Sequence, residues 1–162
     1  MTLHSPVKSP RWPSTSPQAS ARMARVRLKA TGPEQRLGCF LREQGLEFVA
    51  NDASLPGSPD IVFANERVAV FVHGCFWHGH PGCRRATVPL NNQDMWLAKI
   101  QANIRRDRRV SIALRHAGWS VLTNWECQQS DKNLHTFLRR LRRKMQLSAG
   151  RMTVHLGSSK NS

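Results

Sequence analysis

The sequence predicts a single α/β domain built around a mixed β-sheet, and three observations lead to this prediction. With 162 residues, the chain has room for one compact core. Three short apolar runs rich in Val, Phe and Ile lie between residues 46 and 73, and a fourth covers 119–127. Segments with helical periodicity precede, separate and follow them. The resulting order, αβββαβα, is typical of an α/β domain with a mixed sheet.

The first helix is expected over residues 33–44. Pro33 suits a first helical turn, and Gly45 follows the last periodic position. The segment carries an apolar stripe, formed by Leu37, Phe40 and Leu41. Cys39 lies inside the same pattern with no histidine nearby in sequence, so we expect it to be a small core residue.

The strands and later helices follow from similar patterns. Residues 68–73 are apolar at nearly every position, which predicts a central strand covered on both faces. Residues 95–118 predict a long amphipathic helix, because Trp96, Ile100 and Ile104 recur at helical spacing and arginine dominates the polar face. Residues 133–146 predict a final basic helix.

The charge of the chain points to a polyanionic partner. Lys and Arg number 25 against 10 acidic residues, a net charge of +15, and the basic residues recur along the whole chain. A nucleic acid is therefore expected ahead of a membrane surface. No stretch approaches about eighteen apolar residues, and the N-terminus does not read as a signal peptide, so we expect a soluble protein that is not exported.

Composition divides the chain into three parts. Residues 1–20 are rich in Pro and Ser and predict a disordered arm, for which a solvated tail without function is the simplest interpretation. Residues 21–147 are expected to form the folded domain, with 21–32 as its N-terminal segment. Residues 148–162 are expected to be a polar tail.

Cysteine and histidine gather in one short stretch, FVHGCFWHGHPGC. Cys75, His80 and Cys83 lie within nine residues, and Cys127 follows the last predicted strand. Three cysteines and one histidine would make a closed tetrahedral zinc site that staples the loop to this distant strand. Spacing alone leaves a second interpretation open, in which these cysteines are free buried thiols.

Several residues near this stretch are candidates for catalysis. His73 and His78 remain outside the proposed zinc set and could face a common cleft at the end of the central strand. Asp60 opens a strand, where a carboxylate can hold Mg²⁺, although Pro-Asp is also an ordinary turn. Glu34 has a competing interpretation as the capping-box partner of Thr31.

Phe76 and Trp77 are adjacent and flanked by Gly74, His78 and Gly79. On a loop, both rings can project together and wedge between base pairs. Filling of the core is the other explanation for such aromatic residues, and the sequence leaves both open.

Four stretches of the chain resemble the very short patch repair endonucleases, bacterial enzymes that nick DNA beside a T opposite G. These stretches are DASLPGSPDIVF, FVHGCFWHGHPGC, NIRRDRR and GWSVLTNWEC. The resemblance covers about residues 20–127, and HGCFWHGH is its most specific block. It implies a restriction-endonuclease-like core, with a central mixed sheet flanked by helices and a structural zinc site.

The resemblance assigns ligands to two metals. It implies that Asp60 and the backbone carbonyl of Val72 bind a catalytic Mg²⁺. Val72 occupies a position where the family commonly has Thr, so any contact of that hydroxyl is lost. The zinc ligands implied are Cys75, His80, Cys83 and Cys127.

The resemblance also assigns catalytic and DNA-contacting roles. His78 is similar to the family's general base, Asp107 to the acid that orients it, and His73 and Glu34 to residues that support the site. The DNA-intercalating residues implied are Met23, Phe76 and Trp77. Basic residues expected at the DNA backbone, or in the field that attracts it, are Arg22, Arg25, Arg27, Lys29, Arg105, Arg106, Arg108 and Arg109.

Two departures from the family pattern concern the N-terminal segment and the zinc loop. Ala30 replaces a usual Asp, which is expected to weaken placement of that segment. One extra residue separates His80 from Cys83 relative to some relatives, which leaves Cys₃His ligation possible.

The function implied is a Mg²⁺-dependent endonuclease that nicks 5′ of the thymine in T:G mispairs arising from 5-methylcytosine deamination. Such a monomer would act on double-stranded DNA in the bacterial cytoplasm, associated with the nucleoid, without a membrane. Mismatch-repair proteins and a repair DNA polymerase are its expected partners. The rival interpretation is a zinc-stabilised module that binds mismatched DNA without catalysis. An RNA-binding basic protein would explain the charge but not the set of Asp60, His73 and His78.

Overall fold

The computed structural model describes residues 32–156, with side chains described to residue 148. The predicted order of elements is confirmed within this range. The elements are α2 (Gly32–Glu43), β1 (Val49–Ala50), β2 (Ile61–Phe63), β3 (Val68–His73), the 3₁₀ helix η1 (Arg84–Ala86), α3 (Gln93–His116), β4 (Ser120–Trp125) and α4 (Asp131–Leu156). The expected arm, the N-terminal segment with Met23 and the Thr31 cap lie outside the described residues.

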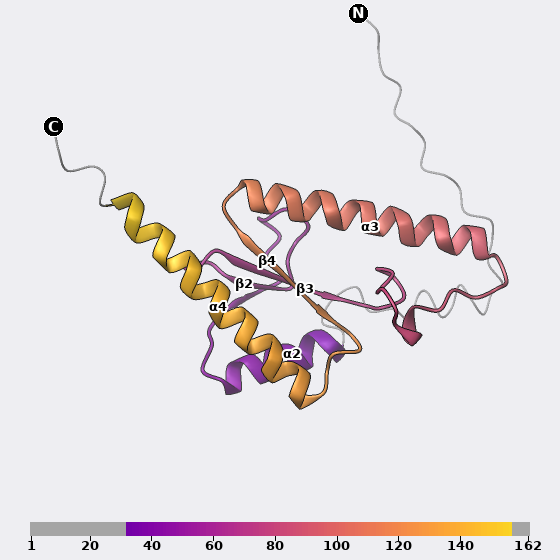
Figure 1. Ribbon diagram of the computed structural model, residues 1–162, viewed down its shortest axis with the longest axis horizontal. Coiled ribbons are helices and arrows are strands. Elements are labelled where there is room, and N and C mark those ends of the chain that lie inside the picture. The colour runs from indigo at the N-terminus through magenta and orange to yellow at the C-terminus, as the bar shows by residue number, and fades with distance from the viewer. Residues whose placement is uncertain (1–31, 157–162) are drawn as a thin grey trace, which may run out of the picture. The chain divides into compact units, whose positions relative to one another are not determined.

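The four strands form one mixed sheet, as predicted, in the order β1-β2-β3-β4 (Figure 1). β1 pairs with β2 and β2 with β3 in antiparallel fashion, whereas β3 and β4 are parallel. The parallel pair requires a long crossover, and α3 provides it. β3 is an internal strand, which explains its nearly continuous apolar sequence.

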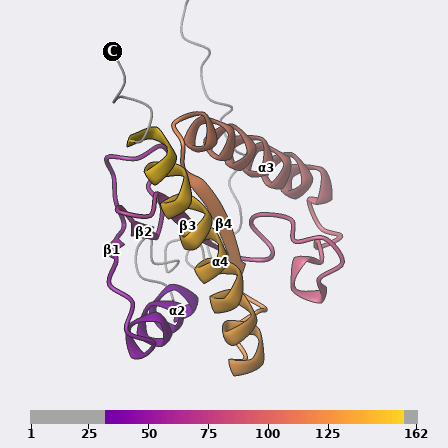
Figure 2. The ribbon, with the colours of Figure 1, turned by 60° about the vertical axis from the view of Figure 1, so that its left-hand side comes forward.

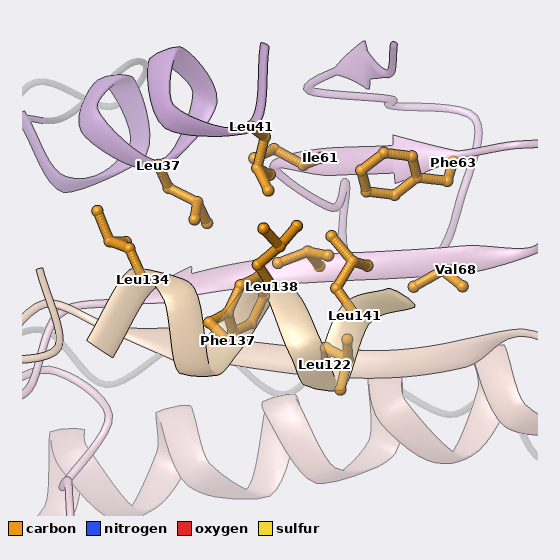
Figure 3. Close-up of a cluster of buried hydrophobic side chains, with 11 residues drawn as sticks. Leu37, Leu41, Ile61, Phe63, Val68, Leu122, Leu134, Phe137, Leu138 and Leu141 are labelled. Atoms are coloured by element: carbon orange, nitrogen blue, oxygen red, sulfur yellow. The ribbon is translucent and has the colours of Figure 1, made fainter. Parts of the chain in front are cut away.

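Helices cover both faces of the sheet. α2 and α4 lie on one face and α3 on the other (Figures 1 and 2). The main core forms under α2 and α4, where leucines of both helices pack on alternate residues of the strands (Figure 3). Its buried members are Leu37, Leu41, Ile61, Phe63, Val68, Val70, Leu122, Leu134, Phe137, Leu138 and Leu141.

Strand alternation places His73 on the opposite face of the sheet. Successive side chains of a strand point to opposite faces of the sheet. Since Val68 and Val70 point into the core under α4, His73 points toward α3. Asp60 lies in the bend just before β2, and its side chain reaches the Val72 amide of β3.

One prediction about the first helix is wrong. The apolar stripe is confirmed, with Leu37 and Leu41 fully buried, but Cys39 is exposed. The buried face of α2 consists of Leu37, Gly38 and Leu41. Cys39 follows Gly38 by about 100° around the helix, which turns its side chain out of the core.

The two long helices differ from expectation in extent and burial. α4 begins two residues before the predicted segment 133–146 and continues to Leu156, so residues 148–156 are helical where a polar tail is predicted. In α3, Ile100 is buried as expected, but Ile104 is 42% exposed. Within the described residues, no helix is both long and apolar enough to cross a membrane.

Candidate active site and metal centre

The loop that follows β3 carries both groups of candidate ligands. Residues 74–83 fold back in tight turns, in which the His78 amide donates to the Gly74 carbonyl and the His80 amide to the Cys75 carbonyl. The two histidines therefore leave the loop in different directions. His78 meets α3, and His80 meets the end of β4.

The first group brings together the four predicted zinc ligands. The ligand atoms of Cys75, His80, Cys83 and Cys127 all lie within 4.8 Å of one another. His80 Nδ1 is 3.6 Å from Cys75 Sγ and 3.3 Å from Cys127 Sγ. Such separations suit atoms that share one tetrahedral ion at about 2.0–2.3 Å. The group could hold a metal ion.

Burial differs among the three cysteines and controls the ionisation of Cys75. Cys75 is fully buried, whereas Cys83 and Cys127 are half-buried. Burial raises the pKa of the Cys75 thiol to about 12, so its thiolate requires a nearby positive charge. Cys75 would therefore be a neutral thiol in the metal-free protein and a thiolate ligand only with an ion bound.

Two residues that sequence reasoning missed support this group. Trp125 stacks on His80, with ring centroids 4.1 Å apart and planes at 11°. Glu126 accepts from the Cys75 amide at 3.3 Å and from Arg85 at 3.4 Å. Their position directly before Cys127 was the available signal, since residues beside a ligand often orient the other ligands.

The second group joins the loop to α3. His78 Nδ1 lies 2.5 Å from Asp107 Oδ2, and His73 stacks on His78 with ring centroids 3.9 Å apart. All three side chains are half-buried. A carboxylate at Nδ1 selects the tautomer with its proton there, which leaves Nε2 of His78 able to accept a proton.

The charges of this group are set by burial and by its own contacts. Burial, followed by the charge of His78, lowers the pKa of His73 to about 4. Burial acts to raise the pKa of Asp107, but the hydrogen bond and charge of His78 hold it below its usual value. At neutral pH the group therefore contains a neutral His73 and an ionised Asp107.

Asp60 is a partly buried carboxylate just before β2, next to the backbone of Val72 in β3. Its Oδ2 accepts a hydrogen bond from the Val72 amide at 2.7 Å. Burial and the negative charge of Glu34 raise the pKa of Asp60 to about 6, despite the opposing effect of the Val72 amide. A carboxylate in this environment is suited to bind a cation, which would offset both effects.

Glu34 is thus close enough to Asp60 to influence its ionisation, although the two residues come from α2 and β2. The capping interpretation of Glu34 depends on Thr31, which lies outside the described residues. A cation at Asp60 would complete its coordination with backbone oxygens, water or substrate, as Mg²⁺ commonly does.

The two loop aromatic residues pack with a third one that sequence reasoning missed. Phe76 and Trp77 make edge contacts with Trp96 of α3, at ring-centroid distances of 5.5 and 6.1 Å. Lys99 Nζ lies 5.1 Å from the centroid of Trp77. Phe76 and Trp77 were expected to contact DNA, and both rings remain partly exposed.

Helix α3 contacts three consecutive residues of the loop, Trp77, His78 and Gly79. Asn103, also missed, donates to the Trp77 carbonyl at 2.9 Å, and Asp107 contacts His78 one turn later. Gly79 has φ +58, and a Cβ there would lie 2.9 Å from Ile104 Cδ1. Glycine is therefore required at this close approach.

Arginines line the outer side of the same helix. Arg105, Arg106, Arg108 and Arg109 are all exposed, and Arg106 lies 3.8 Å from Asp107. The remaining predicted DNA contacts, Met23, Arg22 and Arg25, lie outside the described residues, as do Arg27 and Lys29.

A partly buried carboxylate and a histidine-aspartate pair, beside a Cys₃His group in a strongly basic chain, could together carry out metal-assisted hydrolysis of a polyanionic substrate. The comparisons with known proteins define the family. The chain belongs to the DNA mismatch endonuclease Vsr family, whose model matches residues 14–85. The predicted resemblance is therefore confirmed.

Three relatives each match about two thirds or more of the chain. The chain is 47% identical over 109 residues to the type II nicking enzyme V.XorIIP of Xanthomonas oryzae pv. oryzae, covering 67% of this chain and 79% of the relative. It is 45% identical over 108 residues to the DNA mismatch endonuclease Vsr of Escherichia coli, covering 67% and 69%. The type II nicking enzyme V.NmeAIP of Neisseria meningitidis is 38% identical, with 73% and 84% covered.

Gly79→Ala is expected to destabilise the protein more than Gly45→Ala. Both glycines have positive φ, but a Cβ at Gly45 meets nothing within 4 Å. Gly45→Ala should therefore cost only backbone strain, about 1–2 kcal/mol, whereas Gly79→Ala adds contact with Ile100 and Ile104. Urea unfolding measures both. Equal losses would show that the loop does not depend on its close approach to α3.

Asp60→Asn is expected to stabilise the protein at pH 7.5 without added Mg²⁺. Because the pKa of Asp60 rises from 3.8 to about 6 on folding, its favourable contribution is complete below pH 4 and is lost as the pH rises through 6. Removing the charge should increase the free energy of unfolding by up to about 3 kcal/mol above pH 6 and change it little at pH 4.

Urea unfolding at the two pH values tests this expectation. Asp52→Asn is the control, because hydrogen bonds from Ser54 lower the pKa of Asp52 and no gain is expected above pH 6. An Asp60→Asn variant no more stable than the native protein at pH 7.5 would contradict the proposed environment of Asp60.

Proposed function

We propose that this protein is a Mg²⁺-dependent, strand-specific DNA mismatch endonuclease. It nicks 5′ of the thymine in T:G mispairs that arise from 5-methylcytosine deamination, and so initiates very short patch repair. One observation carries the proposal beyond family membership: His73 and the His78–Asp107 pair form one cluster, and the charge of His78 acts on the partly buried Asp60. A binding module without catalysis has no need of this arrangement.

Asp60 and the backbone carbonyl of Val72 would hold Mg²⁺, with Glu34 supporting the site. The raised pKa of Asp60 supports this assignment, because a bound cation stabilises the ionised carboxylate. Mg²⁺ supplies Lewis-acid activation of the phosphate and stabilisation of the leaving oxygen. The missing Thr hydroxyl at Val72 leaves the carbonyl ligand unaffected.

His78 acts as the general base. Its Nε2 accepts a proton from the water that attacks phosphorus, while Asp107 stabilises the imidazolium that forms. His73 stacks on His78 and stays neutral at pH 7, so it adds no charge that would oppose this protonation. Its role is to position His78 and the attacking water.

Zn²⁺ is the ion proposed for Cys75, His80, Cys83 and Cys127. The soft sulfur ligands and the closed set of four favour a structural zinc ion over a catalytic one. By joining the loop to the end of β4, the ion restricts the residues between Cys75 and His80. The whole domain is proposed to be restriction-endonuclease-like.

Phe76 and Trp77, together with Met23, are proposed to enter the duplex at the mispair. The partial exposure of the two rings in the free protein supports this, because a wedge must be accessible before DNA binds. A mispair costs less to unstack than a matched pair, so wedging favours mismatched sites. Arg22, Arg25, Arg105 and Arg106 would contact the DNA backbone.

The cellular setting follows from this substrate. We propose a monomer that acts on nucleoid DNA in the bacterial cytoplasm. It would hand the nicked duplex to a repair DNA polymerase and cooperate with mismatch-repair proteins. The domain limits proposed are an arm at 1–20, the endonuclease domain at 21–147 with a DNA-contacting segment at 21–32, and a tail at 148–162 that begins within α4.

Nicking of end-labelled duplexes tests the function. With Mg²⁺, the native protein is expected to nick a T:G duplex 5′ of the thymine on one strand and to leave the matched T:A duplex intact. His78→Ala should lower the single-turnover rate by about 10²–10⁴-fold, the usual contribution of a general base. Asp60→Ala should abolish Mg²⁺-dependent nicking.

Two results would contradict the proposal. If His78→Ala or Asp60→Ala nicked the T:G duplex as fast as the native protein, the catalytic role assigned to that residue would be excluded. A well-folded native protein that binds the T:G duplex but does not nick it would favour the mismatch-binding module.

Cys127→Ser is expected to lower the zinc content of the purified protein from about one ion per chain, because it removes one of four ligands. Thermal stability should fall with it, since the ion joins the ends of two strands. Cys39→Ser is the control, because Cys39 is exposed and lies in α2. Equal zinc content in native and Cys127→Ser proteins would exclude Cys127 as a ligand.

A further inference from the structure

The outer face of α4 is strongly basic, and the proposed catalytic function makes no use of it. Within the part of the helix whose side chains are described, six cations are exposed. They are Lys132, Arg139, Arg140, Arg142, Arg143 and Lys144. We call this set the α4 basic face.

This face points away from the candidate active site. Leu134, Phe137, Leu138 and Leu141 turn the opposite side of α4 into the core. The sheet lies between α4 and α3, which carries Asp107 (Figures 1 and 2). A short duplex bound at the site would have to wrap around the sheet to reach the α4 basic face, a larger deformation than a kink at the wedged base pairs.

Neighbouring acids do not neutralise these cations. Asp131 is the only acidic residue in the sequence of α4, and it pairs with Arg36 of α2 at 3.0 Å. The other ion pairs seen within residues 32–148 join His78 and Arg106 to Asp107, and Arg85 to Glu126. None of them includes a member of the α4 basic face.

The helix itself gains nothing from this clustering. Arg139 is followed at i+3 and i+4 by Arg142 and Arg143, and Arg140 by Arg143 and Lys144, and like charges at these spacings destabilise a helix. The cluster sits in the middle of α4, where the helix macrodipole does not stabilise cations. An external polyanion would relieve the repulsion.

We propose that the α4 basic face binds the phosphates of a second segment of double-stranded DNA while the first occupies the active site. This binding is independent of sequence and goes beyond the proposed mismatch nicking. The charge of the face is complementary to a duplex, which carries closely spaced phosphates. On long DNA, the protein would thereby hold two segments together.

The composition of α4 argues against a membrane as the occupant. A membrane-binding amphipathic helix inserts an apolar face. The apolar face of α4 is already buried in the core, and Leu147 is the one large apolar side chain exposed along the described part of the helix. The cations remain as the available contact.

A two-duplex binding measurement tests the proposal with the full-length protein and no Mg²⁺. A donor-labelled 20-base-pair T:G duplex is bound at saturation, and an acceptor-labelled matched duplex is then added. Energy transfer through a ternary complex is expected with the native protein. Arg140→Gln/Arg143→Gln should weaken capture of the second duplex at least about tenfold and lower its salt slope by about 1.8.

Arg42→Gln/Arg115→Gln is the matched control, because it removes two exposed arginines from other helices. It should retain capture of the second duplex. Thermal unfolding checks that the α4 variant is folded. Nicking of the short T:G duplex should be unchanged in both variants. A native protein that captures the second duplex but does not nick the first would contradict the proposed function and leave the α4 basic face supported.

Three outcomes would overturn the inference. The native protein captures no second duplex, the two variants lose capture equally, or the α4 basic face prefers another polyanion. The last is measured with duplex RNA and with vesicles containing anionic phosphatidylserine. Stronger binding of either, lost in the α4 variant, would assign the face to that partner.

Discussion

The parallel pairing of β3 with β4 is the constraint on which the rest of the structure depends. It aligns His73 with Trp125, so both strands end at the same edge of the sheet. The loop after β3 and the residues after β4 therefore meet, which brings Cys127 to the other three members of the Cys₃His group. The same pairing requires the crossover helix α3, and this helix carries Asp107 to His78.

The main apolar core and the candidate catalytic residues occupy different parts of the domain. One face of the sheet is closed by the leucines of α2 and α4, and it contains most of the buried apolar surface. Outside this core lie groups that lower stability on their own, namely a carboxylate whose pKa is raised by burial and a histidine whose pKa is lowered. A rigid core allows such groups to persist, and metal or substrate binding would then recover part of the cost.

Much of the fold was predictable because its signals are local. The apolar run at Val68–His73 and the helical stripe at Leu37 and Leu41 depend on periodicity alone, and both are confirmed. Cys39 was predicted wrongly, because apolar character does not determine which side of a helix a residue occupies. Residues close in sequence to a candidate metal ligand were also easier to predict than residues of other elements that reach the site only in the folded structure.

Site residues that lie within one short motif could be predicted from the sequence, whereas those brought together by packing of separate elements could not. Cys75, His80 and Cys83 stand close in sequence. In contrast, the effect of the Glu34 charge on the pKa of Asp60 depends on how α2 packs against the sheet. Trp96 and Asn103 were missed for the same reason, since a helical pattern does not reveal which loop the helix will hold. The family resemblance supplied the roles that spacing left open.

X-ray absorption at the zinc edge tests most directly whether the ends of β3 and β4 share one ion. The account predicts three sulfur ligands at about 2.3 Å and one nitrogen at about 2.0–2.1 Å in the full-length protein. It also predicts two sulfur ligands in Cys127→Ser loaded with zinc. A native spectrum with two or fewer sulfur ligands would contradict the account, because the loop and β4 would then not meet at the metal.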